Sequence, residues 1–89
     1  MDKEGAKERA ERYIVMTENA LSSIEPKKTA GVAAGHARDV IDTASRYLSD
    51  AKYFHGKGDL IAALATVNYA HGWIDAGKKV GLFRQINKK

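Results

Sequence analysis

The sequence predicts an all-α protein that folds as an antiparallel up-and-down three-helix bundle. Apolar residues recur every three or four positions along nearly the whole chain, and no stretch shows the sustained alternation that marks a strand. Proline occurs once, at Pro26, so little interrupts this helical period. Because 89 residues leave no room for a second core, we expect one helical-bundle domain over residues 1–89. Its helices are expected at roughly 3–24, 29–56 and 59–80, followed by a short C-terminal tail at 81–89.

The first predicted helix carries an apolar stripe on one side and charged residues on the other. Its stripe consists of Ala6, Ala10, Tyr13, Ile14, Thr17, Leu21 and Ile24. Such a helix gains most of its stability when the stripe packs against a neighbour. The segment therefore predicts a surface helix of a bundle.

The start of the second helix is open between two positions. Ser22 and Glu25 have the spacing of a capping box, and Pro26 suits a first helical turn, so the helix can begin near residue 25. Thr29 is an alternative cap, with a start near residue 30. Its apolar stripe is long and unbroken: Ala33, Ala37, Val40, Ile41, Ala44, Tyr47, Leu48, Ala51 and Phe54.

A short link joins the second and third helices. Gly56 or Gly58 can adopt the left-handed conformation that ends a helix, and Asp59 is a strong N-cap for the next one. Because the link is so short, the two helices are expected to lie antiparallel and side by side.

The third helix lacks a charged face. The fifteen residues from Leu60 to Ile74 carry no formal charge in a chain that is 29% charged. Six of its residues form the expected core stripe: Leu60, Ala63, Leu64, Val67, Ala70 and Ile74. A second apolar strip lies on another side of the same helix: Ala62, Ala65, Tyr69, Trp73, Ala76 and Val80.

This second strip predicts an interface, because contiguous exposed apolar surface with aromatic residues is typical of one. Two covers are possible and can coexist: the tail at Leu82 and Phe83, or a second copy of the chain. We expect a homodimer or a protein partner. The expected interface residues are Ala62, Tyr69, Trp73, Ala76, Val80 and Phe83.

Composition excludes several classes of function. The net charge of +4 is concentrated in the last third of the chain, without the dense basic stripe or stacking aromatics that indicate nucleic-acid binding. The absence of cysteine excludes disulfides and thiolate metal sites. No apolar run reaches the length of a membrane span, and the first residues lack the apolar core of a secretory signal. We therefore expect a cytoplasmic protein with no membrane association.

One edge of the third helix carries candidate chemistry. Asn68, His71 and Asp75 step by three and four positions, so they share one edge that a small ligand or a metal ion can use. A metal site needs three or four ligands, and a semi-buried histidine held by hydrogen bonds is the commoner arrangement. We assign no catalytic residue, metal or cofactor. Gly72 and Gly77 are expected to permit the close approach of another helix.

Part of the chain resembles a known family. The segments Tyr47–Phe54 and Gly58–Leu60, the string from Asn68 to Gly77, and Gly81–Phe83 are similar to the archaeal family called domain of unknown function 357. The resemblance implies a small up-and-down three-helix bundle, similar to bacterial immunoglobulin- and albumin-binding modules. It implies no activity.

Two other families fit less well. A tetratricopeptide array needs about three repeats, and no 34-residue self-similarity is present. The small helical ribonucleases of toxin–antitoxin systems place a histidine four to six residues after an arginine, whereas Arg46 and His55 are nine apart. The sequence thus favours a non-catalytic protein-interaction or self-association domain over an enzyme. The alternative is a small-ligand, metal-binding or ribonuclease-like protein that uses the edge of Asn68, His71 and Asp75.

Overall fold

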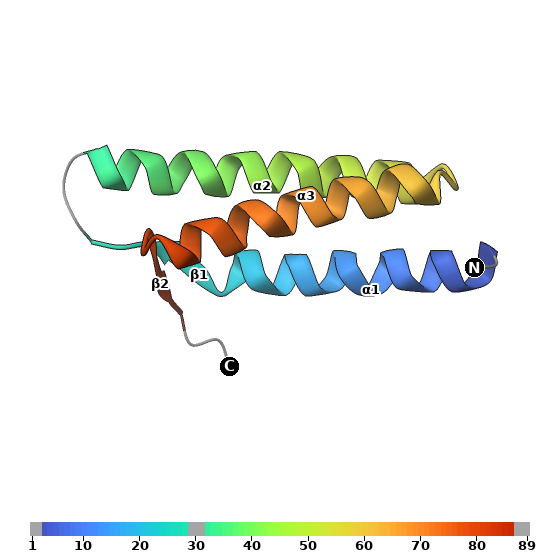
Figure 1. Ribbon diagram of the computed structural model, residues 1–89, viewed down its shortest axis with the longest axis horizontal. Helices are drawn as coiled ribbons and strands as arrows, with labels where there is room; N and C mark the ends of the chain where they lie inside the picture. Colours follow the sequence, from blue (N-terminus) through green and yellow to red (C-terminus); the bar gives the residue numbers. More distant parts are fainter. Residues whose placement is uncertain (1–2, 29–31, 87–89) are drawn as a thin grey trace.

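The computed structural model describes residues 3–28 and 32–86 and contains three helices in an up-and-down arrangement (Figure 1). The described elements, in chain order, are α1 (Lys3–Ser22), β1 (Ile24–Pro26), α2 (Val32–Gly56), α3 (Leu60–Lys79) and β2 (Phe83–Gln85). Each helix runs antiparallel to the one before it. The predicted all-α three-helix fold is confirmed, and two strands of three residues each are added to it.

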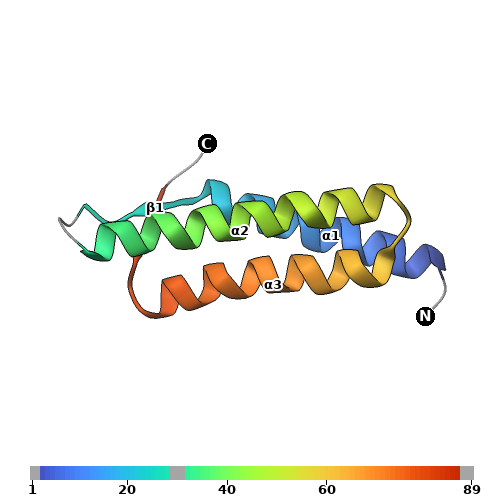
Figure 2. The ribbon, with the colours of Figure 1, turned by 90° about the horizontal axis from the view of Figure 1, so that it is seen from above.

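The three helices pack in a triangle. Figure 1 places α3 between α1 and α2, and Figure 2 places it to one side of both. The helix α3 contacts each of the other two helices, most extensively α2. The described part of the chain measures 47 × 26 × 18 Å. One side of α3 therefore faces away from the rest of the bundle.

Small residues let the helices approach each other closely. Six alanines have no exposed surface: Ala10, Ala37, Ala44, Ala51, Ala63 and Ala70. One group of larger side chains packs among them around Ile14, Leu48 and Val67, and a second group surrounds Ile74 near the end of α3. The predicted core stripe of α3 is confirmed at Ala63, Val67, Ala70 and Ile74, whereas Leu60 and Leu64 are only half-buried.

The turn between α2 and α3 has the predicted chemistry. Gly58 has φ +80°, the left-handed conformation that glycine adopts without strain. The carboxylate of Asp59 accepts a hydrogen bond of 3.2 Å from the backbone N–H of Ala62, as an N-cap does. The Gly58–Asp59 pair thus ends one helix and begins the next.

The segment after α1 does not begin a helix at Pro26. Ile24–Pro26 forms the strand β1 instead, so the capping box predicted at Ser22 and Glu25 is wrong. Proline favours an extended conformation in the residue before it and cannot donate to a ladder, which suits the end of an edge strand. The alternative cap Thr29 lies outside the described residues. The helix α2 is described from Val32.

The tail pairs with this strand. After Gly81, which has φ +78°, strand β2 runs antiparallel to β1 with Ile24 opposite Gln85 and Pro26 opposite Phe83. An ion pair between Glu25 and Arg84 joins the two strands. The expectation of Phe83 at an exposed interface is wrong: its side chain is 8% exposed and belongs to the core around Ile74.

Candidate functional site: the outer face of α3

A mostly apolar surface, bordered by Lys79 at its C-terminal end, covers much of the exposed side of α3. We call it the outer face, and its residues are Ile61, Ala65, Asn68, Tyr69, Gly72, Trp73, Ala76 and Val80. Ile61 is 85% exposed, Val80 71%, Tyr69 53% and Trp73 37%. Apolar side chains that are scattered singly on a surface need no explanation, but a contiguous row with two aromatic rings is typical of a binding surface.

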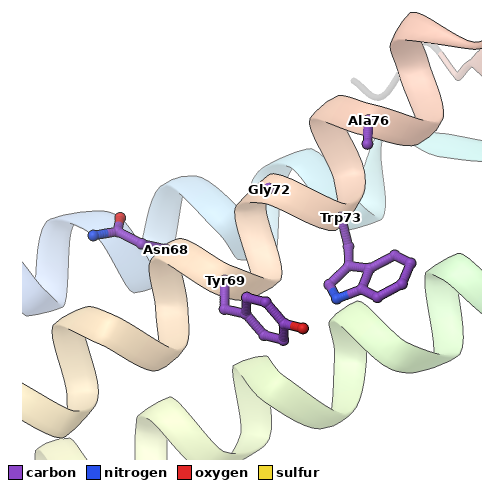
Figure 3. Close-up of a pocket in the computed structure, with 5 residues that line it drawn as sticks. All are labelled: Asn68, Tyr69, Gly72, Trp73 and Ala76. Atoms are coloured by element: carbon purple, nitrogen blue, oxygen red, sulfur yellow. The ribbon is translucent and has the colours of Figure 1, made fainter.

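Two aromatic side chains, Tyr69 and Trp73, form the side of the outer face that lies nearest to α2. The ring of Tyr69 meets Tyr47 of α2 edge-to-face at 4.6 Å between centroids, and it meets Trp73 edge-to-face at 6.3 Å. Both Tyr69 and Trp73 point from α3 toward α2 (Figure 3). Because these contacts already hold the rings in place, binding a partner would cost them little conformational entropy.

A shallow apolar pocket lies over Gly72. Its volume is about 330 Å³, and its lining residues are Asn68, Tyr69, Gly72, Trp73 and Ala76 (Figure 3). A methyl group added at Gly72 would meet no atom within 4 Å, so the glycine leaves open space and does not accommodate a neighbour within the chain. The prediction that Gly72 permits the close approach of a helix therefore does not apply to a helix of the same chain. It stays a prediction for a helix of another chain.

The predicted edge of Asn68, His71 and Asp75 lies on the α1 side of the outer face. Asn68 and His71 line a second hollow of about 140 Å³ together with Tyr13, Met16 and Thr17 of α1. The Nε2 atom of His71 is 3.6 Å from Asp75 Oδ1, which is longer than a hydrogen bond. The structure thus brings the three predicted residues together at one edge.

Thr17 orients the imidazole of His71. The hydroxyl of Thr17 donates to the carbonyl oxygen of Tyr13 at 2.8 Å, and it lies 3.3 Å from Nδ1 of His71. A hydroxyl has one hydrogen. While Thr17 donates it to Tyr13, the hydroxyl can only accept from His71, which favours the neutral imidazole with its proton on Nδ1. The sequence placed Thr17 on the apolar stripe of the first helix and gave no role for its hydroxyl, and this polar residue is 1% exposed.

The described residues contain no group of three or more histidine, cysteine, aspartate or glutamate side chains that could hold a metal ion. The pair of His71 and Asp75 would supply two ligands, fewer than a structural or catalytic zinc site uses. Over the same residues, no helix combines the length and apolar character needed to cross a membrane.

The structure exposes some of the predicted interface residues and buries others. Tyr69, Trp73, Ala76 and Val80 are exposed on the outer face, and Ala62 is half-buried. Sequence reasoning missed Ile61, the most exposed large apolar side chain among the described residues. Ile61 lies between the two apolar stripes predicted for the third helix, and this position was the signal that could have identified it as an exposed apolar residue.

Comparison with known proteins agrees with the fold. The family described as "Protein of unknown function (DUF357)" matches residues 12–83. A crystal structure of a protein of this family from Archaeoglobus fulgidus is similar to the chain with a TM-score of 0.77 and 24% sequence identity. The similarity covers 93% of this chain and 96% of that one. No curated protein matches the chain.

Proposed function

The chain belongs to the family of proteins of unknown function DUF357, and we propose that it is a non-catalytic helical module that self-associates through the outer face of α3. The observation that carries this proposal is the mostly apolar outer face itself, on which Ile61, Tyr69, Trp73 and Val80 remain exposed. The fold alone supports no particular function, so the proposal rests on this surface.

The magnitude of the apolar exposure supports a weak association. An aromatic side chain buries about 150–250 Å², and roughly half of Tyr69 and a third of Trp73 remain exposed. At about 25 cal/mol per Å², covering both rings in each of two copies would contribute roughly 7–10 kcal/mol. Association costs about 4–15 kcal/mol, so the contributions of Ile61 and Val80 decide the balance. A weak, reversible dimer is the expected result.

The second candidate, a small-ligand site at the hollow beside His71, has less support. The hollow of about 140 Å³ is lined by one imidazole and one carboxamide, from His71 and Asn68. However, Nδ1 of His71 is engaged by Thr17, and Nε2 faces the carboxylate of Asp75. Both ring nitrogens of His71 therefore already face polar neighbours within the chain.

Sedimentation equilibrium of charge variants tests the proposal. We expect the wild type to associate at roughly tens to hundreds of micromolar and Trp73→Glu to remain monomeric at the same concentrations, because burying an unpaired carboxylate in an interface is costly. Since Trp73 also touches the bundle, the double variant Ile61→Glu/Val80→Glu repeats the test at side chains that are 85% and 71% exposed. The control, Ser45→Glu on the exposed side of α2, should associate like the wild type. A monomeric wild type would refute the proposal.

A further inference from the structure

We infer that the outer face binds a second copy in an antiparallel arrangement, in which the exposed side of the Tyr69 ring of each copy packs level with the pocket over Gly72 of the other. The twofold axis would pass level with the midpoint between Ala70 and His71. This inference rests on the proposed self-association and adds to it the register and direction of the two α3 helices.

The outer face is complementary to itself about that midpoint. In a twofold interface every contact occurs twice. If residue i of one copy contacts residue j of the other, then residue j of the first copy contacts residue i of the second. Four pairs of outer-face residues share the same midpoint: Ile61 with Val80, Ala65 with Ala76, Asn68 with Trp73, and Tyr69 with Gly72. In an antiparallel pair of helices, the members of each pair lie at the same level on opposite chains.

The shapes of these pairs match. Tyr69 is 53% exposed, and the pocket of about 330 Å³ lies over Gly72, so the exposed side of the ring lies at the same level as a hollow of the other copy. Ala65 and Ala76 are small, which permits the two helices to approach closely on either side of this contact. Ile61 and Val80, the two most exposed large side chains of the outer face, would lie level with each other at the two ends.

The charges of α3 favour the antiparallel direction. Asp59 precedes the helix, and Lys78 and Lys79 lie in its last turn. An antiparallel pair places Lys79 level with Ala62 of the partner subunit, one helical turn from that chain's Asp59. A parallel pair would place lysines beside lysines and aspartates beside aspartates. The macrodipoles of the two helices also point in opposite directions in the antiparallel arrangement, so the positive end of each lies beside the negative end of the other.

The area of the surface indicates a reversible dimer. A helix of 20 residues is about 30 Å long and about 10 Å wide, so each copy would contribute about 300 Å². The total of about 600 Å² lies below the range of stable interfaces, which bury about 1,200–2,000 Å². The experiment therefore needs protein at tens to hundreds of micromolar, and a cross-link to record the arrangement.

Cysteine cross-linking tests the register, because the chain contains no cysteine. We expect a short thiol-reactive cross-linker to join Ala65→Cys of one chain to Ala76→Cys of another when the two single variants are mixed. Neither single variant should cross-link alone, since eleven residues separate the positions, about 16 Å along an α-helix. Cross-linking of Ala65→Cys to itself would indicate parallel helices and overturn the inference, while the proposed self-association would stand.

A pocket-filling variant provides an independent test. Gly72→Leu should fold, because a Cβ added there meets no atom within 4 Å and the position opens to solvent, and it should raise the dimer Kd at least tenfold. The matched control is Gly35→Leu, at a helical glycine of α2 that also has no atom within 4 Å of an added Cβ; its Kd should stay within twofold of the wild type. A Gly72→Leu variant that dimerises as well as the wild type would overturn the inference, whereas a wild type without any dimer would overturn the proposed function itself.

Discussion

The ring of Phe83 lies against Gly77, in the space that a side chain at position 77 would occupy. A Cβ on Gly77 would lie 2.6 Å from Cζ of Phe83, well inside van der Waals contact. This contact and the pairing of β2 with β1 hold the tail in the core at the end of the bundle. The tail residue Phe83 is therefore not the cover of the outer face of α3, and that surface is left exposed in the single chain.

Gly77→Ala should lower the free energy of unfolding by about 1–3 kcal/mol, because the added methyl group overpacks the core against Phe83. Gly72→Ala is the matched control on the same helix. It meets no neighbour within the chain, so it should raise stability by up to about 1 kcal/mol through helix propensity. Urea denaturation at submicromolar concentration, where self-association does not contribute, measures both. Equal effects of the two substitutions would contradict the contact at Gly77.

Phe83→Ala should cost about 3–5 kcal/mol, the range for truncating a buried phenylalanine. The neighbouring substitution Arg84→Ala removes only a partly exposed ion pair with Glu25 and should cost less than about 1 kcal/mol. Chemical denaturation of both variants compares a core contact with a surface contact in the same strand. Similar small losses would show that the tail contributes no core packing.

Ile74→Ala should cost about 2–5 kcal/mol, since Ile74 has no exposed surface. Asp59→Ala should cost about 0.5–2 kcal/mol, because it removes the cap on α3 and leaves the core unchanged. The order of the two losses, measured from denaturation midpoints, checks the assigned core side of α3. An Ile74→Ala variant as stable as the wild type would mean that this assignment is wrong.

Neutral His71 should carry its proton on Nδ1, because Thr17 can only accept a hydrogen bond from it while its own hydroxyl donates to Tyr13. Two-bond ¹H–¹⁵N correlation spectra of the imidazole distinguish the two tautomers directly. Thr17→Val removes the acceptor and should weaken this preference, while Tyr13→Phe keeps the Thr17 hydroxyl and should preserve it. A neutral wild-type imidazole protonated on Nε2 would contradict the hydrogen-bond arrangement.

The helices and the α2–α3 turn could be predicted because their signals are local. The helical period locates each apolar stripe, and Gly58 with Asp59 specifies the turn through backbone conformation and capping. The strands could not be predicted, because three residues are too few for an alternation. Their pairing joins Ile24 to Gln85 across almost the whole chain, and only the folded bundle brings these residues together.

In the candidate site, too, the sequence predicted the features that depend on local spacing and missed those that depend on how the helices pack. Helical spacing alone placed Asn68, His71 and Asp75 on one edge, and it also placed Tyr69 and Trp73 on a second strip. The role of Thr17 depends on how α1 and α3 align, which no local pattern encodes. For the same reason the sequence did not separate the two glycines: Gly77 accommodates Phe83, whereas Gly72 opens to solvent.

Trp73, the one tryptophan of the chain, gives the most direct measurement of self-association through the outer face of α3. Its indole N–H signal can be followed by ¹H–¹⁵N correlation spectroscopy as wild-type protein is concentrated from about 10 μM to about 1 mM, a range that brackets the weak binding expected from the small area. We predict a saturable shift of this signal, accompanied by Tyr69 and Gly72 and absent in Ile61→Glu/Val80→Glu. A Trp73 signal that stays unchanged over the whole range, with a monomeric sedimentation mass, would contradict the account.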